Sequence, residues 1–367
     1  MIWYLCASAA PRRMQNPLPN WQVNARTNKQ WRLRVRLVSE LSDWVYQNHD
    51  PDAPVFGPPV PFTRQKAGQY VIDHLALGKM VHPSEAVDPL FTSQDYEDES
   101  LQDQLYPGRY REFRGLVRAK IDEVLAFDTA HAPEVTWEWV AEFLQAKRCN
   151  ARRLWQLQCE LIGHAPRHPP LGRASPAVTL KMTALVLRYM CMGAFESNFH
   201  ASILPGFAHR LPGFVECFAS PFNHKLRDYY SMFDQDRDFG SRGNFFAFLK
   251  HHGDTLPPGN YEMNPPFTNA IFERLQAVIA RTLAAQRTVT ILLIGPNWGD
   301  TNWVPSLDRT LVHAPAMYQT FSGQYVQNIP YVQDLTGAQF PQKTLAWVFS
   351  SRPPPPALLE LLNTGAR

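Results

Sequence analysis

The chain has 367 residues, of which 45% are hydrophobic and 12% aromatic, and its 36 Lys and Arg side chains exceed its 33 Asp and Glu side chains by three. A disordered chain dominated by charge is excluded, because 22 Phe, 13 Tyr and 10 Trp provide enough apolar surface to offset the entropy lost on folding. The net charge of +3 is too small to identify a nucleic-acid-binding protein by itself. The length fits one large domain or two ordinary ones.

No membrane-spanning helix, disulfide framework or metal site is predicted. The longest apolar runs fall far short of the roughly 20 residues that a membrane span needs. The five cysteines are odd in number and lack CxxC or zinc-ligand spacing, which favours a reducing intracellular compartment. The alternating acids Asp234, Asp236 and Asp238 lack the glycine and terminal glutamate of a calcium-binding loop.

The first half of the chain is predicted to be mainly helical. Apolar residues recur every three to four positions over residues 31–45, which is the spacing of a helix packed along one face. Further helical patterns cover residues 112–127, 136–161 and 177–192, and Pro-containing segments separate them. We therefore predict a mainly helical domain over residues 1–170.

Charge is distributed unevenly along this helical half. Residues 1–40 hold seven basic side chains and one acid, whereas residues 81–105 hold seven acids and no Lys or Arg. A second basic group contains Arg148 and Arg152, which are four positions apart and so lie on one face of a predicted helix. Both basic groups are candidates to contact phosphates, although a solvated helix face explains the same pattern.

Beyond residue 210, short apolar or aromatic runs alternate with helical stretches such as residues 269–283. The runs predicted as strands are residues 214–218, 245–249, 261–263, 288–294 and 344–349. Strands that alternate with helices indicate βαβ units and a mainly parallel sheet, so the predicted class is α/β over residues 171–352, followed by a Pro-rich end at 353–367. Ligands of such sheets bind beyond the carboxyl ends of the strands.

The clearest chemical motif is Asn264-Pro265-Pro266-Phe267, which follows a predicted strand and precedes a predicted helix. This layout suits methylation of an exocyclic amine. The adenine amino nitrogen is a poor nucleophile because its lone pair is delocalised, and accepting its hydrogens with the Asn264 side-chain oxygen and the Pro265 carbonyl favours the tetrahedral geometry that attacks. Proline preorganises that carbonyl, and Phe267 can stack on the base. A rigid proline turn with a purely structural role is the alternative.

Two further segments are candidates to bind a cofactor. Residues 218–223 follow the first strand of the alternating half, where a class I methyltransferase usually has a Gly-rich loop; no glycine is present here. Residues 239–243 offer two glycines, a hydroxyl and a cation to a ligand, and a preceding aspartate can accept ribose hydroxyls. The candidate donor-pocket residues are Ala219, Ser220, Pro221, Asn223, Asp236, Gly240, Ser241, Arg242 and Gly243.

In their order along the chain, these motifs resemble those of the phosphorylated-CTD-interacting-factor family, the cap-specific adenosine-N6 methyltransferases. The similar segments are residues 216–223, 239–243, 262–267, 294–298 and 321–324, preceded by Arg188 and Tyr189. The resemblance covers roughly residues 180–350, and several ordered motifs are more specific than one Pro-Pro turn.

The resemblance implies a Rossmann-type class I methyltransferase domain beside a helical domain that supports RNA and cap binding. It implies S-adenosyl-L-methionine as the methyl donor and, as the acceptor, capped mRNA that begins with 2′-O-methyladenosine, in the nucleus or else in the cytoplasm. It gives the catalytic role to residues 264–267. The candidate RNA-binding residues are Arg148, Arg152, Arg188, Trp298 and Phe321.

Animal members of the family carry a WW module that reads the polymerase tail. Trp21 and Trp31 are too close together for such a module and lack its hairpin pattern, so polymerase-tail binding is not expected. Two other functions stay open. One is a DNA or internal-RNA adenine methyltransferase that flips out its target base. The other is a methyltransferase-like fold that binds capped RNA or protein without catalysis.

Overall fold

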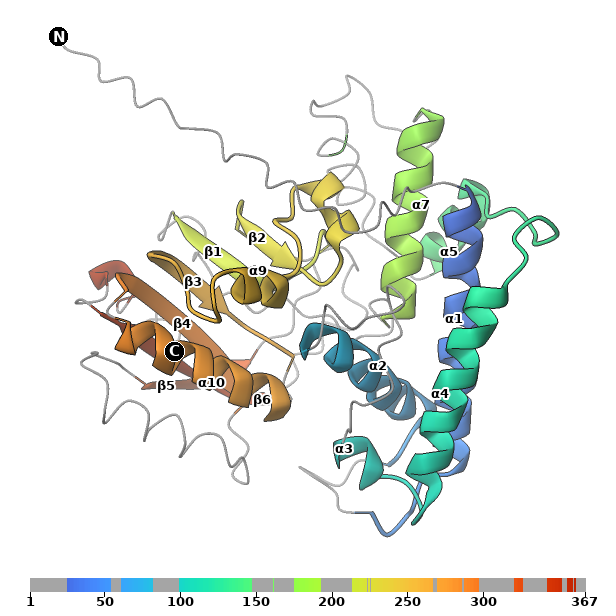
Figure 1. The fold of residues 1–367 in the computed structure, drawn as a ribbon, viewed down its shortest axis with the longest axis horizontal. Helices are drawn as coiled ribbons and strands as arrows, with labels where there is room; N and C mark the ends of the chain where they lie inside the picture. Colours follow the sequence, from blue (N-terminus) through green and yellow to red (C-terminus); the bar gives the residue numbers. More distant parts are fainter. Residues whose placement is uncertain are drawn as a thin grey trace.

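The structure is a computed structural model that describes residues 25–53, 61–81, 99–146, 161, 175–192, 213–222, 224, 226–266, 269–285, 287–296, 320–325, 342–351, 355–358 and 360. A group of helices lies beside an α/β sheet (Figure 1). No helix in these ranges is long and apolar enough to cross a membrane.

The helical half is built around α1. Its helices are α1 (Ala25–Gln47), α2 (Arg64–Val81), α3 (Glu99–Gln102), α4 (Arg109–Ala126), α5 (Trp137–Ala146) and α7 (Pro176–Cys191). α1 contacts α2, α4 and α7, and its buried Leu37, Leu41 and Val45 follow the spacing predicted from the sequence. The helices predicted at 31–45, 112–127 and 177–192 are confirmed. The one predicted at 136–161 is present as α5, and residues 147–160 lie outside the described ranges.

α7 is buried on nearly all sides. Ser175 caps its N-terminus by accepting a hydrogen bond from the Val178 amide, and Pro176 occupies the first turn, where its missing N–H costs nothing. Every residue from position 182 to position 189 is buried. A helix that is apolar around its circumference belongs in a core, and α7 accordingly packs between α1, α5 and loops of the sheet.

The sheet contains six strands in the order β2-β1-β3-β4-β6-β5. They are β1 (Phe214–Ala219), β2 (Tyr229–Ser231), β3 (Gly259–Met263), β4 (Val289–Pro296), β5 (Thr320–Tyr325) and β6 (Gln342–Ser350). β1 to β4 are parallel, whereas β6 runs antiparallel to both β4 and β5. The predicted α/β class and mainly parallel sheet are therefore confirmed.

One predicted strand is wrong. Residues 245–249 belong to α9 (Phe245–His251), whose N-cap Asn244 accepts a hydrogen bond from the Ala247 amide at 3.0 Å. The short aromatic run is explained by burial of Phe245, Phe246 and Leu249 on one side of a helix. β2 and β5 were not predicted.

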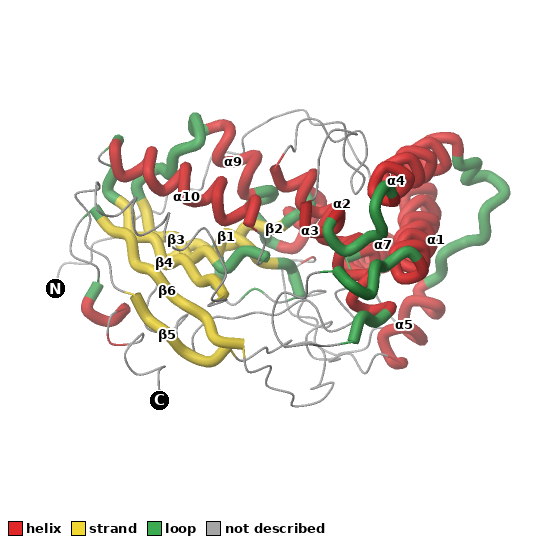
Figure 2. The backbone as a smooth tube through the Cα atoms, turned by 90° about the horizontal axis from the view of Figure 1, so that it is seen from below, coloured by secondary structure: helices red, strands yellow, loops and turns green. Residues whose placement is uncertain are grey.

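Helices α9 and α10 (Asn269–Ala284) cover one face of the sheet (Figure 2). Tyr261 and Met263 of β3 point into a buried cluster with Leu275 and Val278 of α10. Because side chains alternate along a strand, Glu262 lies on the opposite face. A second cluster joins the helical half to Phe222, Phe233 and Phe239, which follow β1 and β2, so the helices pack against the carboxyl ends of these strands.

Candidate functional site

The order of the strands reverses between β1 and β3. From β1 the chain moves outward to β2, and it then returns past β1 to form β3 on the other side. Both strands run in the same direction, so the loops that follow them leave from the same edge of the sheet. Such a switch point is where open α/β sheets bind their ligands. The segments that leave here are residues 220–222 and 264–266, from two of the predicted motifs.

The Asn-Pro-Pro turn connects β3 to α10, as the sequence predicts. Asn264 is half-buried, Pro265 is buried and Pro266 is exposed. The two prolines fix φ on both sides of the Pro265 carbonyl, which makes this part of the turn rigid. Phe267 lies outside the described residues, so the structure does not place its ring.

The loop after β1 is held by its own polar groups and by one aromatic anchor. Ser220 is buried, and its hydroxyl accepts a hydrogen bond from the Phe222 amide at 3.2 Å. The fully buried Phe222 ring contacts Tyr189 of α7 edge to face, with ring centroids 5.3 Å apart. Ala219 is the last residue of β1, Pro221 is part of the loop, and Asn223 lies outside the described residues. The loop reaches the switch point without a glycine.

The Gly-Ser-Arg-Gly segment lies along the outer edge of β2. The Arg242 amide donates to the Tyr229 carbonyl at 2.7 Å, and the Ser231 amide donates to the Gly243 carbonyl at 2.9 Å. The hydroxyl of the buried Ser241 lies 2.7 Å from the Ser231 hydroxyl and accepts from the Gly243 amide. Gly240 and Gly243 have φ of 88° and 94°, a conformation that glycine adopts without strain. The structure thus separates this segment from the β1 loop by the width of β2.

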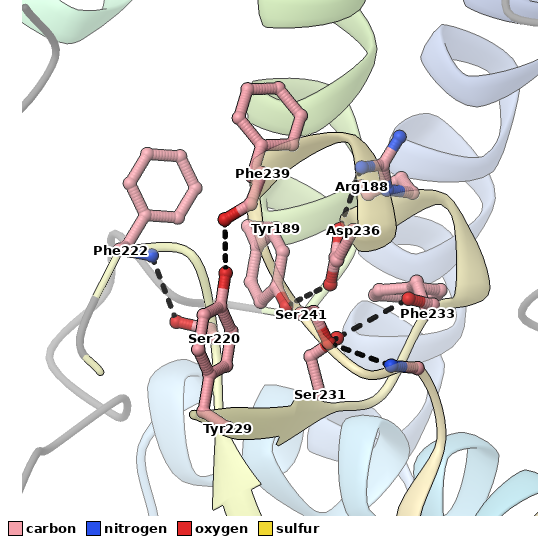
Figure 3. A network of polar contacts seen from close by, with 11 residues as sticks. Arg188, Tyr189, Ser220, Phe222, Tyr229, Ser231, Phe233, Asp236, Phe239 and Ser241 are labelled. Atoms are coloured by element: carbon pink, nitrogen blue, oxygen red, sulfur yellow. Dashed lines mark hydrogen bonds and ion pairs between the residues drawn. The ribbon is translucent and has the colours of Figure 1, made fainter. Parts of the chain in front are cut away.

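Asp236 and Arg188 form a buried ion pair (Figure 3). Arg188 Nη2 donates to Asp236 Oδ1, and Tyr189 Oη donates to Asp236 Oδ2, each at 2.7 Å. Burial, together with the Asp236 carboxylate, raises the pKa of Tyr189, so its hydroxyl stays protonated and can donate. Asp236 was predicted to accept ribose hydroxyls and Arg188 to contact RNA. In the structure these two buried side chains pair with each other and join α7 to the 3-10 helix η2 (Asp234–Phe239).

The other candidate RNA-binding residues are not brought together by the described structure. Arg148, Arg152 and Trp298 lie outside the described residues, and Phe321 is placed only through the backbone of β5.

Two functional candidates were missed in the sequence. Glu216 of β1 and Glu262 of β3 are register partners on adjacent strands, and both are buried. The Leu226 amide donates to Glu216 Oε2 at 3.0 Å. Burial, with a contribution from Glu216, raises the pKa of Glu262 well above its ordinary value. The sequence did contain a signal for these two residues, because each is an acid inside a short apolar segment predicted as a strand.

Comparison with known proteins addresses the sheet half of the chain. Residues 173–326 match the sequence model of a family described as "Phosphorylated CTD interacting factor 1 WW domain". The described elements in that range are α7, η2, α9, α10 and β1 to β5. Trp31, one of the two tryptophans considered for a WW module, lies buried in α1, and Trp21 lies outside the described residues.

Two similar proteins, from Mus musculus and Homo sapiens, are each named mRNA (2′-O-methyladenosine-N(6)-)-methyltransferase. Each is 32% identical over 139 residues, which make up 35% of this chain and 19% of the relative. This chain therefore matches only about a fifth of the length of these relatives. Through the matched segment, residues 173–326 of the chain are similar in sequence to the phosphorylated-CTD-interacting-factor family.

Proposed function

We propose that the chain is an S-adenosyl-L-methionine-dependent methyltransferase that acts on the N6 amine of the cap-adjacent 2′-O-methyladenosine of mRNA. The observation that carries this proposal is the position of the Asn-Pro-Pro turn, which leaves β3 at the switch point beside the loop that leaves β1. The names of the mouse and human relatives support the choice of reaction and acceptor.

The proposal includes a Rossmann-type class I arrangement of the sheet. Three features of the topology support it: a first strand in the interior of the sheet, a reversal of strand order beside it, and parallel strands β1 to β4. In domain terms, we propose a helical support over residues 1–170 for RNA and cap, and a catalytic domain over residues 171–352. A nuclear location is part of the same proposal, with the cytoplasm as the alternative.

The residues at the switch point fit a methyl donor that has a polar, positively charged end. The β1 loop supplies a buried, rigid backbone, and the neighbouring Glu262 has buried carboxylate oxygens with no hydrogen-bond partner among the described residues. When bound, S-adenosyl-L-methionine supplies an electrophilic methyl group. We propose that residues 219–223 hold the donor, with residues 240–243 contributing from the segment beside β2.

The protein's own part in the reaction is to orient and activate the acceptor amine. In this mechanism the Asn264 side-chain oxygen and the Pro265 carbonyl each accept one hydrogen of the adenine amine, and Phe267 stacks on the base. These contacts favour the tetrahedral nitrogen that attacks, and they fix its direction of approach. The methylated ammonium is acidic enough to lose its proton to water, so no strong base is required.

The test is methyl transfer by the Asn264→Ala variant. We expect loss of at least about a hundredfold in kcat, because one of two positioned hydrogen-bond acceptors is removed, with donor affinity nearly unchanged. Asn260→Ala on the same strand is the matched control, since Asn260 lies near the amino end of β3, away from the loops that leave its carboxyl end, and should retain activity. Undiminished activity of Asn264→Ala would exclude the proposed mechanism.

The acceptor is tested by mass spectrometry of nucleosides after reaction with capped RNA, uncapped RNA and duplex DNA. Cap-dependent formation of N6,2′-O-dimethyladenosine is expected. Equal rates on uncapped RNA or on DNA would indicate an internal adenine methyltransferase instead. Binding of capped RNA without any methylation would indicate a platform that has lost catalysis.

A further inference from the structure

The buried acids Glu216 and Glu262, named here the carboxyl pair, occupy the point where β1 and β3 stop pairing. The register of the two strands runs from Phe214 opposite Asn260 to Glu216 opposite Glu262 and goes no further. Beyond this pair, β1 continues to Ala219, and β3 leads within two residues to Asn264. The carboxyl pair therefore lies at the base of the switch point, next to both loops that leave it.

Glu262 is buried with its polar atoms unsatisfied. Its side chain is 1% exposed, and neither carboxylate oxygen has a hydrogen-bond partner among the residues that the structure describes. Buried polar atoms are nearly always hydrogen-bonded, because leaving them without a partner costs their full desolvation free energy. Glu262 thus requires either a proton or a ligand that donates hydrogen bonds.

The surroundings of Glu262 increase this requirement. Glu216 on β1 adds negative charge, and on the other side the register partner Leu292 of β4 is apolar. Burial raises the pKa of the neighbouring Cys217 thiol, which therefore stays neutral. Arg242, a cation whose charge acts on Cys217, is engaged with Asp228 at 2.9 Å. Burial and Glu216 together raise the pKa of Glu262, which favours a protonated carboxyl when no ligand is bound.

We propose that Glu262, assisted by Glu216, binds the primary ammonium group at the amino-acid end of the methyl donor. This inference rests on the proposed function, because it assigns one end of the donor in the same site. An ammonium group carries a full positive charge and three N–H donors, so it satisfies the carboxylate oxygens and compensates their charge. The sulfonium has no N–H to donate, and the adenine amine has no charge, so neither meets both requirements.

Protons are linked to this binding. A cation next to Glu262 favours the ionised carboxylate, so the group releases its proton to solvent as the ammonium binds. The affinity for ligands with the ammonium group consequently increases as pH rises through the range in which Glu262 loses its proton. Ligands without this group bind with no such pH dependence.

The experiment compares two ligands that undergo no methyl transfer. S-adenosylhomocysteine retains the amino-acid end, whereas 5′-methylthioadenosine shares the adenosine thioether and lacks that end. Isothermal titration calorimetry at pH 6, 7 and 8 gives both affinities for the full-length wild type, for Glu262→Gln and for the control Glu273→Gln. Glu273 is a matched control because it is an exposed carboxylate on α10.

For Glu262→Gln we expect the affinity for S-adenosylhomocysteine to fall by about tenfold or more, the value of a charge-assisted hydrogen bond. The affinity for 5′-methylthioadenosine should stay within about twofold, as a contact confined to the ammonium predicts. In the wild type, affinity for S-adenosylhomocysteine should rise with pH, and this rise should be absent in Glu262→Gln but present in Glu273→Gln. Equal effects on both ligands, or none, would overturn the inference.

The test remains decisive in three further cases. If Glu262→Gln does not fold, the wild type alone decides, because a pH-dependent affinity for S-adenosylhomocysteine but not for 5′-methylthioadenosine is expected and its absence overturns the inference. If the wild type binds S-adenosylhomocysteine in this manner but methylates no RNA, the proposed function fails and the ammonium site stands. If it binds neither ligand, both fail.

Discussion

Asp236 shows how one buried charge connects distant parts of the chain. Its carboxylate is fully buried and receives hydrogen bonds from Arg188 and Tyr189, two neighbours on α7. The Arg188 guanidinium also lies over the Phe233 ring, with 5.8 Å between Cζ and the ring centroid. The ion pair holds η2 at one position along α7. Because both charges are desolvated, their mutual attraction mainly prevents the large cost of leaving either one alone.

We therefore expect Asp236→Asn to lower the free energy of unfolding by about 3–5 kcal/mol, since the buried Arg188 charge loses its counterion. Urea denaturation measures this value. Asp228→Asn is the matched control, because Asp228 pairs with Arg242 at 2.9 Å with both side chains nearly half exposed. Its cost should stay below about 1 kcal/mol. Similar costs for the two variants would contradict the assignment of a structural role to Asp236.

The position of a candidate site residue could be predicted from the sequence where the residues that act together are adjacent in the chain. The Asn-Pro-Pro turn is contiguous, and its flanking strand and helix are recognisable beside it. Asp236 was predicted to accept ribose hydroxyls from the pattern of alternating acids alone. Its partner Arg188 is 48 residues away in the sequence, and that pattern carries no information about such a partner. The carboxyl pair was missed for the same reason, since only the strand register brings Glu216 next to Glu262.

At the scale of elements, long amphipathic segments were predicted well and short ones poorly. α1, α4, α7 and α10 each extend over at least four turns, so their apolar period is visible. The run at 245–249 is too short to distinguish a helix from a strand, and tertiary packing together with the Asn244 cap selects α9. β2 has three residues, and its pairing with β1 makes it a strand.

The pairing of β1 with β3 has a consequence for stability. Burial raises the pKa of Glu262 in the folded state above its ordinary value of 4.5, so the native protein binds more protons than the unfolded chain. Stability without ligand should therefore fall as pH rises from about 4.5 through the raised pKa, by up to about 1.4 kcal/mol per pH unit for one proton. Glu262→Gln removes this titration.

Urea unfolding of the wild type and Glu262→Gln between pH 5 and pH 8 measures this effect. The variant should gain stability relative to the wild type as pH increases, and the difference should be smallest at pH 5. A difference that stays constant over this range would show that Glu262 does not titrate there.

At the scale of the whole molecule, one core joins the helical half to the sheet half. Trp31 of α1 is 1% exposed and contacts Phe233 edge to face at a centroid distance of 5.6 Å. Phe233 follows β2, and Tyr189 of α7 contacts the same ring. The boundary predicted between residues 170 and 171 thus assigns α7 and α1 to different domains, although these helices pack together. A continuous core of this kind favours cooperative unfolding of both halves.

Trp31→Ala tests this cooperativity. We expect the free energy of unfolding to fall by about 3–5 kcal/mol, because a large buried aromatic is removed. Hydrogen exchange of amides in α1 and in β3 should accelerate by the same factor if both halves unfold together. Leu125→Ala, at a side chain that is 63% exposed, should change stability by less than about 0.5 kcal/mol. Faster exchange confined to the helices would indicate two separately unfolding units.

The segment beside β2 also affects how copies of the chain meet. A strand at the edge of a sheet presents unpaired amides and carbonyls, onto which another molecule can add a strand and start aggregation. On β2, the outward Tyr229 carbonyl and Ser231 amide are already occupied by the backbone of Arg242 and Gly243. These two backbone groups of β2 are therefore not available to a strand from a second copy of the chain. The two glycines contribute to this protection, because their positive φ lets the chain fold back against its own sheet.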